Sequence, residues 1–305
     1  MLVYAGKRIL LALLVALAVS FISFMILNLS GDPAAALAGA DATPEEVEYV
    51  REKYGLDRPL LVQYAEWARR AMGGDLGDSP YFNQPVKDII GGRIGVTMIL
   101  GVCAFAFAVF LGIPLGVIAA LRPNTWLDRL ALTLSVLGQA MPNFFFGLIL
   151  IIFFGVMLRL LPISGSETWK HFIMPAMALG YYAVPSLMRL TRTGMLEVLA
   201  SDYIRTARAK GLHALPVLFK HALRNAIIPV VALAFVQFGY MLGGAFVIEV
   251  VFAVRGIGFL AVRSIERTDL PVVQAIVLLL AVIYVLMTLF ADLLNAFLDP
   301  RIRVK

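Results

Sequence analysis

Residues 201–229 read SDYIRTARAKGLHALPVLFKHALRNAIIP and form the longest strongly basic segment of an otherwise apolar chain. The segment contains one acidic residue, Asp202, and a larger number of basic residues: Arg205, Arg208, Lys210, Lys220 and Arg224. An apolar segment lies on either side. Loops rich in Lys and Arg between membrane spans face the cytoplasm. The segment therefore predicts a cytoplasmic loop between two spans.

The order of residues within this loop predicts two short helices. Ser201 suits a helix N-cap, where its side chain accepts hydrogen bonds from the free backbone amides of the first turn. Asp202 suits the first turn itself, because the positive end of the helix dipole favours an acid there. Gly211 fits the left-handed position that ends a helix. Pro216 fits the first turn of a second helix, which leads to Pro229. From charge alone, a solvated loop that anchors two spans is the simpler interpretation.

Several short motifs in this loop resemble those of a known family. They are Asp202-Tyr203, Thr206-Ala207-Arg208-Ala209-Lys210-Gly211, His221-Ala222, Arg224-Asn225-Ala226 and Pro229. These motifs are similar to the cytoplasmic loop of permeases in the dipeptide/oligopeptide branch of bacterial ATP-binding-cassette importers, which also handles nickel and glutathione. In that superfamily the loop forms the coupling helix, which docks on an ATPase subunit. Its general consensus has Glu-Ala-Ala where this chain has Arg205, Thr206 and Ala207, a departure that is usual in the peptide branch.

The resemblance implies a coupling role for the loop residues Asp202, Arg205, Thr206, Ala207, Arg208, Lys210 and Gly211. The cations would pair with acids on the ATPase, and the small Ala207 and Gly211 would permit close seating. It also implies partners: a second homologous permease, two ATPase subunits that bind ATP and Mg²⁺, and an extracytoplasmic substrate-binding protein.

The composition indicates an integral membrane protein. Hydrophobic residues make up 61% of the 305-residue chain and charged residues 15%, whereas soluble domains average about 45–50% and about 25%. The single Cys103 excludes an internal disulfide. Net charge is +6, and because the cations gather in loops beside apolar runs, membrane orientation explains it without nucleic acid.

The chain divides into four parts. Residues 1–30 contain a first span, for which a signal peptide is the alternative. Residues 31–94 predict a helical extracytoplasmic loop, with a capping box at Thr43-Pro44-Glu45-Glu46. Residues 95–298 predict a five-span permease core that includes the coupling loop. Residues 299–305 predict a cytoplasmic tail.

Within the core, apolar runs predict spans over 96–121, 130–161, 172–190, 227–248 and 272–298. The run 130–161 is too long for one upright span, and Pro142-Asn143 interrupts it, which predicts a kink or an interfacial lead-in. Glu249, Phe252, Gly256 and Gly258 are placed in a short outside segment. Both termini are expected in the cytoplasm and the protein in the inner membrane.

Polar residues inside apolar runs are candidates for a translocation pathway, because burying them in lipid is costly. They are Gln139, Asn143, Gln237, Gln274 and Asp292. We expect Gln139, Asn143 and Gln237, with Gly244, along the pathway. The alternative is that they bond to backbone groups of neighbouring helices.

Several other functions lack the residues they need. The chain has no phosphate-binding loop of the Gly-x-x-x-x-Gly-Lys-Ser/Thr kind, so any ATPase must be a separate chain. His171, His213 and His221 lack zinc-ligand spacing, and no metal or cofactor is expected on this chain. An intramembrane hydrolase would use Ser135 or Ser186, but no His lies deep in a span. An ion channel or ion-driven secondary transporter remains the non-enzyme alternative.

The sequence thus predicts an all-α integral membrane protein with six transmembrane helices in the type I importer permease fold and a helical outside domain between spans 1 and 2. Its predicted function is that of the permease subunit of an ATP-driven peptide importer, not an enzyme, coupled to ATPases through residues 201–211. Permeation of glutathione or nickel complexes is the alternative within the family.

Overall fold

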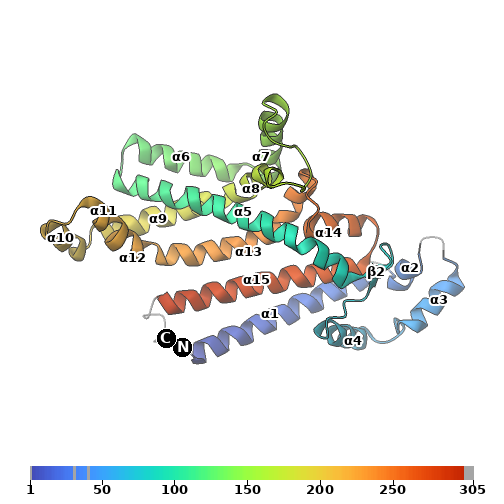
Figure 1. Cartoon of the computed structure of the whole chain (residues 1–305). Coiled ribbons are helices and arrows are strands. Elements are labelled where there is room, and N and C mark those ends of the chain that lie inside the picture. Colours follow the sequence, from blue (N-terminus) through green and yellow to red (C-terminus); the bar gives the residue numbers. More distant parts are fainter. Residues whose placement is uncertain (1, 30–31, 40–41, 299–305) are drawn as a thin grey trace.

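The computed structural model describes residues 2–29, 32–39 and 42–298. It is helical apart from one small hairpin (Figure 1). The predicted tail, residues 299–305, lies outside the described residues.

The first helix, α1 (Leu2–Leu29), leads to three short helices, α2 (Pro33–Ala38), α3 (Pro44–Lys53) and α4 (Leu60–Met72). The predicted capping box is present, since Thr43 and Glu46 exchange side-chain and backbone hydrogen bonds at the start of α3. A two-stranded antiparallel hairpin follows, formed by β1 (Asp78–Ser79) and β2 (Gln84–Pro85). This part of the chain was predicted as helical only.

Helix α5 (Val86–Leu121) has 36 residues. It begins earlier than the predicted span, so the boundary between 94 and 95 falls inside one helix. At a rise of 1.5 Å per residue, α5 is about 54 Å long, which exceeds the hydrocarbon thickness of about 30 Å. It therefore extends beyond the membrane core.

The next two apolar runs are broken helices. The run predicted over 130–161 divides into α6 (Trp126–Ala140), α7 (Asn143–Leu150) and a π-helical continuation, η1 (Ile151–Met157). The break falls at Met141 and Pro142, both extended, which confirms the predicted interruption.

The following run contains η2 (Trp169–Phe172), α8 (Ile173–Gly180), η3 (Tyr181–Ala183) and α9 (Val184–Leu199). Helix α9 continues past the predicted end at 190, so Arg189 and Arg192 are helical and do not begin the loop.

The basic segment folds as α10 (Asp202–Ala209), α11 (Ala214–Pro216), η4 (Val217–Leu223) and α12 (Arg224–Ala226). The chain then forms α13 (Ile228–Val251), α14 (Ile257–Glu266) and α15 (Leu270–Leu298). Helix α14 begins within the stretch that was predicted only as a short outside segment.

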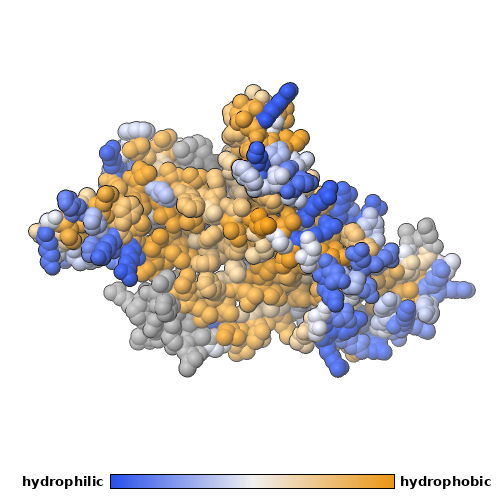
Figure 2. All heavy atoms as spheres, viewed as in Figure 1, coloured by the Kyte–Doolittle hydropathy of each residue, from blue (hydrophilic) through white to orange (hydrophobic). Residues whose placement is uncertain are grey.

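Four described helices are long and apolar enough to cross a membrane: Gly6–Ile26, Val86–Leu121, Ile228–Val251 and Leu270–Leu294. Asn143–Met157 is a shorter apolar helix. Figure 2 shows hydrophobic residues over the middle of the molecule and hydrophilic residues at its two ends, around α10 and around α2–α4. This is the pattern of a protein that spans a bilayer.

The largest buried cluster lies where α5, α8 and α13 meet, with Leu100, Met174, Leu187, Met241 and Ile248 among its members. A second cluster joins the start of α5 to α14 and α15. A third joins the end of α5 to α9 and the basic segment. Helix α5 thus contributes to all three clusters, and α15 packs against both α13 and α1.

The junction between α13 and α14 is built around a buried carboxylate, Glu249, whose side chain is 0% exposed. Thr97 Oγ1 on α5 donates to Glu249 Oε1 at 2.6 Å, and the amide of Phe259 donates to Glu249 Oε2 at 3.0 Å. The amide of Ile257 donates to Thr97 Oγ1 at 2.8 Å. An acid thus occupies the electropositive start of α14 and satisfies its free amides. Glu249 belongs to α13, which continues to Val251, past the predicted end of the span at 248.

This junction requires glycine at two positions. A Cβ at Gly256 would lie 2.4 Å from Glu249 Oε1 and 2.4 Å from Thr97 Oγ1. A Cβ at Gly258 would lie 2.2 Å from the Phe246 Cα, which is backbone and does not rotate away. The Gly-x-Gly spacing therefore lets α14 approach both the carboxylate and α13.

We predict that Gly258→Ala lowers the free energy of unfolding by about 1–3 kcal/mol, because the added methyl overpacks a backbone contact. Detergent-solubilised protein titrated with denaturant gives this value. Gly243→Ala on α13 is the matched control, because a Cβ there meets nothing within 4 Å. Equal stability of the two variants would contradict the proposed packing.

Candidate functional site

The predicted coupling segment, residues 201–229, folds as expected at its turns. Helix α10 ends in Lys210, and Gly211 has φ +75°, the left-handed conformation that was predicted. Ser201 differs from the prediction, since its side chain makes no cap hydrogen bond to the α10 amides and instead donates to the Val198 carbonyl at 2.5 Å. The preceding helix α9 ends at Leu199, and the Val198 carbonyl also accepts a hydrogen bond from the Ser201 amide at 3.0 Å.

One face of α10 packs against the rest of the chain. Ile204 is 0% exposed and Ala207 is 7% exposed, and both belong to the cluster that contains Met195 and Ala222. The expectation that Ala207 lets a partner approach closely is therefore wrong. Its small side chain instead lets α10 lie close to η4 of the same chain.

The other face of α10 is exposed and cationic. The predicted coupling residues Asp202, Arg205, Thr206, Arg208 and Lys210 are all exposed. Asp202 and Arg205 form an ion pair at 3.3 Å with side chains 93% and 79% exposed, so the pair contributes little to stability.

Large apolar side chains are exposed beside these cations. They belong to Leu212, Leu215 and Phe219, which follow α10 in the chain. We call the exposed cations of α10 and these three apolar side chains the basic surface. Mixed apolar and cationic patches of this kind are typical of protein interfaces.

A buried ion pair connects α6 to α9 near this segment. Arg192 donates to both carboxylate oxygens of Asp128, at 2.6 and 2.7 Å. Asp128 is 2% exposed and also accepts the Asn124 amide at 2.9 Å. The hydrogen bonds from Arg192 hold the pKa of Asp128 below its usual value, although burial opposes this. The pair fixes the start of α6, which precedes the broken apolar run.

A second feature lies among the apolar helices. A cavity of about 400 Å³ is lined by Asn143 of α7, Gln237 and Gly244 of α13, Tyr182, Tyr240 and apolar neighbours. Three of the four predicted pathway residues therefore line the same space. A Cβ at Gly244 would meet nothing within 4 Å. We call this space the central cavity.

The fourth predicted pathway residue, Gln139, is placed elsewhere. Its side chain accepts from Arg189 at 3.2 Å and donates to Ser186 Oγ at 3.4 Å, both on α9. Both partners are side chains, whereas the alternative to a pathway role was bonding to backbone groups of a neighbouring helix.

Sequence analysis missed the tyrosines of the central cavity and the pair between Asp128 and Arg192. Tyr182 and Tyr240 gave no signal, because an aromatic residue in an apolar run is usually a packing residue. Asp128 and Arg192 are 64 residues apart. Asp128 has Arg129 beside it and Arg192 has Arg189 three positions before it, so the sequence did not single out this pair.

We predict that Asp128→Asn lowers the free energy of unfolding by roughly 3 kcal/mol, because it leaves Arg192 largely buried without its counter-ion. Because the pKa of Asp128 is lowered, its contribution is complete above the unfolded value of about 3.9 and is lost as pH falls through the folded value. The loss in the variant should therefore be constant from about pH 5 to pH 8.

The measurement is denaturant unfolding at several pH values. Asp202→Asn is the control, since that residue belongs to an exposed pair and its loss should change stability by less than about 0.5 kcal/mol. Equal effects of the two changes would refute the assigned role of Asp128.

Comparison with known proteins assigns this architecture to a family. Residues 112–304 match the family described as "Binding-protein-dependent transport system inner membrane component", and residues 1–100 match its N-terminal companion, "Binding-prot-dependent transport system membrane comp, N-term".

Curated relatives match over the whole chain. The "Glutathione transport system permease protein GsiC" of Escherichia coli (strain K12) is 42% identical over 306 residues, covering 100% of both chains. The protein of the same name from Pectobacterium atrosepticum is also 42% identical, with the same coverage. Among solved structures, a chain of the inward-facing MetNI methionine ABC transporter superposes with a TM-score of 0.59 at 18% identity, covering 69% of this chain and 96% of that chain. At that identity the likeness shows the fold alone.

These matches extend over the basic segment, the central cavity and the apolar helices alike. The chain therefore belongs to the family of binding-protein-dependent transport system inner membrane components, as an inner-membrane permease subunit of an ATP-binding-cassette importer in the peptide/nickel branch.

Proposed function

We propose that this chain forms one half of the translocation pathway of an importer for small peptides of the glutathione kind. The observation that carries the proposal is the central cavity, in which the amides of Asn143 and Gln237 and the phenols of Tyr182 and Tyr240 line a space between helices. Amides and hydroxyls both donate and accept, as peptide groups do, so they can replace the water around a peptide as it crosses.

The chemistry of this lining favours a peptide over a nickel ion. Nickel prefers imidazole and thiolate ligands in proteins. The described residues around the central cavity include neither His nor Cys. The relatives that match the whole chain are glutathione transport system permeases, which supports the same choice.

For the topology we propose six spans. Helices α1, α5, α13 and α15 each provide one, α7 with η1 provides another, and α8 with α9 provides the sixth. Alternation then places the basic surface and both termini in the cytoplasm, and α2–α4 outside. The separation of the two hydrophilic ends in Figure 2 supports this arrangement.

For the mechanism we propose alternating access. Two separate ATPase subunits, which bind ATP and Mg²⁺, would pull on the basic surface as they close. A second homologous permease would complete the pathway, and an extracytoplasmic binding protein would deliver substrate. Because Ile204 and Ala207 are buried beneath α10, a force on α10 passes into the third cluster and so to α5 and α9.

We predict that the double change Arg208→Glu and Lys210→Glu lowers retention of the ATPase chains by at least about tenfold when the complex is purified. Reversing two exposed charges turns attraction to an acidic partner surface into repulsion. The measurement is co-purification from detergent-solubilised membranes, followed by mass spectrometry. Lys87→Glu, at an exposed position near the start of α5, is the matched control. Full retention of the ATPases in the double variant would count against the coupling role.

We predict that Gly244→Leu abolishes transport while the complex still assembles, because the new side chain projects into the open central cavity. Uptake of labelled glutathione into proteoliposomes that hold the complete complex, with ATP and the binding protein, measures this. Gly243→Leu on the same helix is the control, since a Cβ there also meets nothing within 4 Å but the residue does not line the cavity. Normal uptake by Gly244→Leu would exclude the cavity as the pathway, and uptake without ATPases would favour a secondary transporter.

A further inference from the structure

A second cavity lies at the opposite end of the molecule from the basic surface. It has a volume of about 220 Å³ and lies between the end of α1, helix α4, the β1–β2 hairpin and the start of α15. We call it the junction pocket. The residues that matter below are Phe24, Trp67, Arg70, Asp75, Asp78 and Gln274. Pockets for drug-sized ligands have about 300–1,000 Å³, so this one suits a smaller molecule.

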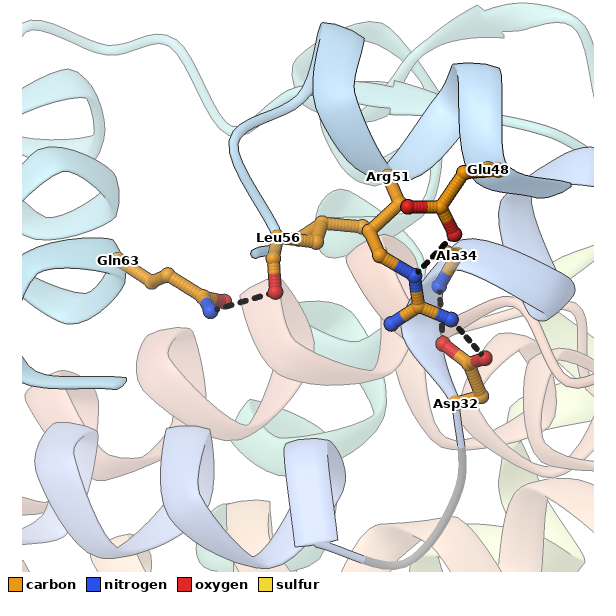
Figure 3. Close-up of polar contacts among 6 residues, drawn as sticks. All are labelled: Asp32, Ala34, Glu48, Arg51, Leu56 and Gln63. Atoms are coloured by element: carbon orange, nitrogen blue, oxygen red, sulfur yellow. Dashed lines mark hydrogen bonds and ion pairs between the residues drawn. The ribbon is translucent and has the colours of Figure 1, made fainter. Parts of the chain in front are cut away.

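The walls of the junction pocket are held by specific contacts. Tyr64 OH on α4 and Ser20 Oγ on α1 are hydrogen-bonded at 2.7 Å, and the rings of Phe24 and Trp67 lie 5.9 Å apart. Gln63 donates to the Leu56 carbonyl at 3.0 Å (Figure 3). The pocket is therefore largely preformed.

The short helices beside the pocket are held in the same way. Arg51 donates to Asp32 at 2.7 Å and to Glu48 at 3.1 Å, and Asp32 accepts the Ala34 amide at the start of α2 (Figure 3).

One polar group in this wall has no hydrogen-bond partner among the described residues. Gln274 is 8% exposed, and its Nε2 atom makes no hydrogen bond in the described structure. A buried amide donor without an acceptor costs free energy, and such groups are rare in native proteins. Because Gln274 lines the pocket, a carbonyl or carboxylate oxygen of a bound molecule could accept a hydrogen bond from its Nε2 atom.

The pocket also carries charges of both signs. Asp75 and Asp78 contribute carboxylates, and one oxygen of Asp75 accepts the Gly77 amide at 2.9 Å. Arg70 lines the same pocket and forms no ion pair among the described residues. The aromatic rings of Phe24 and Trp67 provide an apolar wall. Acids, a cation, an amide donor and aromatic rings together match a molecule that has an ammonium group, a carboxylate and an apolar body.

We propose that the junction pocket is a second substrate site, which holds a zwitterion of amino-acid to dipeptide size outside the spans. Asp75 and Asp78 would accept from its ammonium group, and Gln274 Nε2 and Arg70 would donate to its carbonyl or carboxylate oxygens. The ligand class rests on the peptide substrate proposed above, but the site is separate from the central cavity, with which it shares no lining residue.

The test is equilibrium binding of radiolabelled glycylleucine to the purified permease–ATPase complex in lipid nanodiscs, without the binding protein. Wild type should bind, and Gln274→Leu should weaken binding by about tenfold or more. Asp78→Asn, at an exposed position, should weaken it without affecting folding. N-acetyl-glycylleucine, which has no ammonium group, should fail to compete. Gln84→Leu, in the exposed strand β2 outside the pocket, should bind as wild type does.

Further variants separate this site from the pathway. Gly244→Leu should retain binding, because it fills only the central cavity. Absence of binding in wild type, or binding that survives both Gln274→Leu and Asp78→Asn but is lost in Gly244→Leu, would overturn the proposal. ATP-driven glutathione uptake by the complete wild-type system is measured in parallel. If uptake occurs without a junction site, only this inference falls; if the pocket binds while no peptide is transported, the proposed function falls instead.

Discussion

The structure depends on one buried carboxylate. Among the described residues Glu249 forms no ion pair; instead, Thr97 and the Phe259 amide of α14 donate hydrogen bonds to its oxygens. A buried carboxylate without such donors would be strongly unfavourable. Because these donors come from α5 and α14 while the carboxylate belongs to α13, the same interaction sets the relative positions of three helices.

At the opposite end of the molecule, hydrophobic packing has the corresponding role. Ile204 and Ala207 hold α10 against the end of α5 and against α9, while the pair between Asp128 and Arg192 holds α6 to α9. The charged residues of α10 do not belong to this cluster, and their side chains remain in solvent. One face of this two-turn helix is thus packed against the chain, and the other is exposed.

Local signals predicted local structure well. The capping box at Thr43, the left-handed Gly211 and the break at Pro142 each depend on a few neighbouring residues, and each was confirmed. Composition and motifs also indicated the family. What sequence did not reveal depends on contacts between distant segments. Thr97 and Glu249 are 152 residues apart, and nothing near either one identifies the other. The contact between Gln139 and Arg189 on α9 likewise joins residues 50 positions apart.

The length of α5 has a mechanical consequence. One end of this helix is packed in the cluster beneath the basic surface, through Val117 and Ala120. Its other end is packed against α14 and α15, through Val86 and Ile90. A stiff rod of about 54 Å converts a tilt of about 4° into a shift of about 4 Å at its far end. Because its two ends belong to different clusters, a small rotation of α5 would move the cluster beneath the basic surface and the cluster at α14 and α15 together.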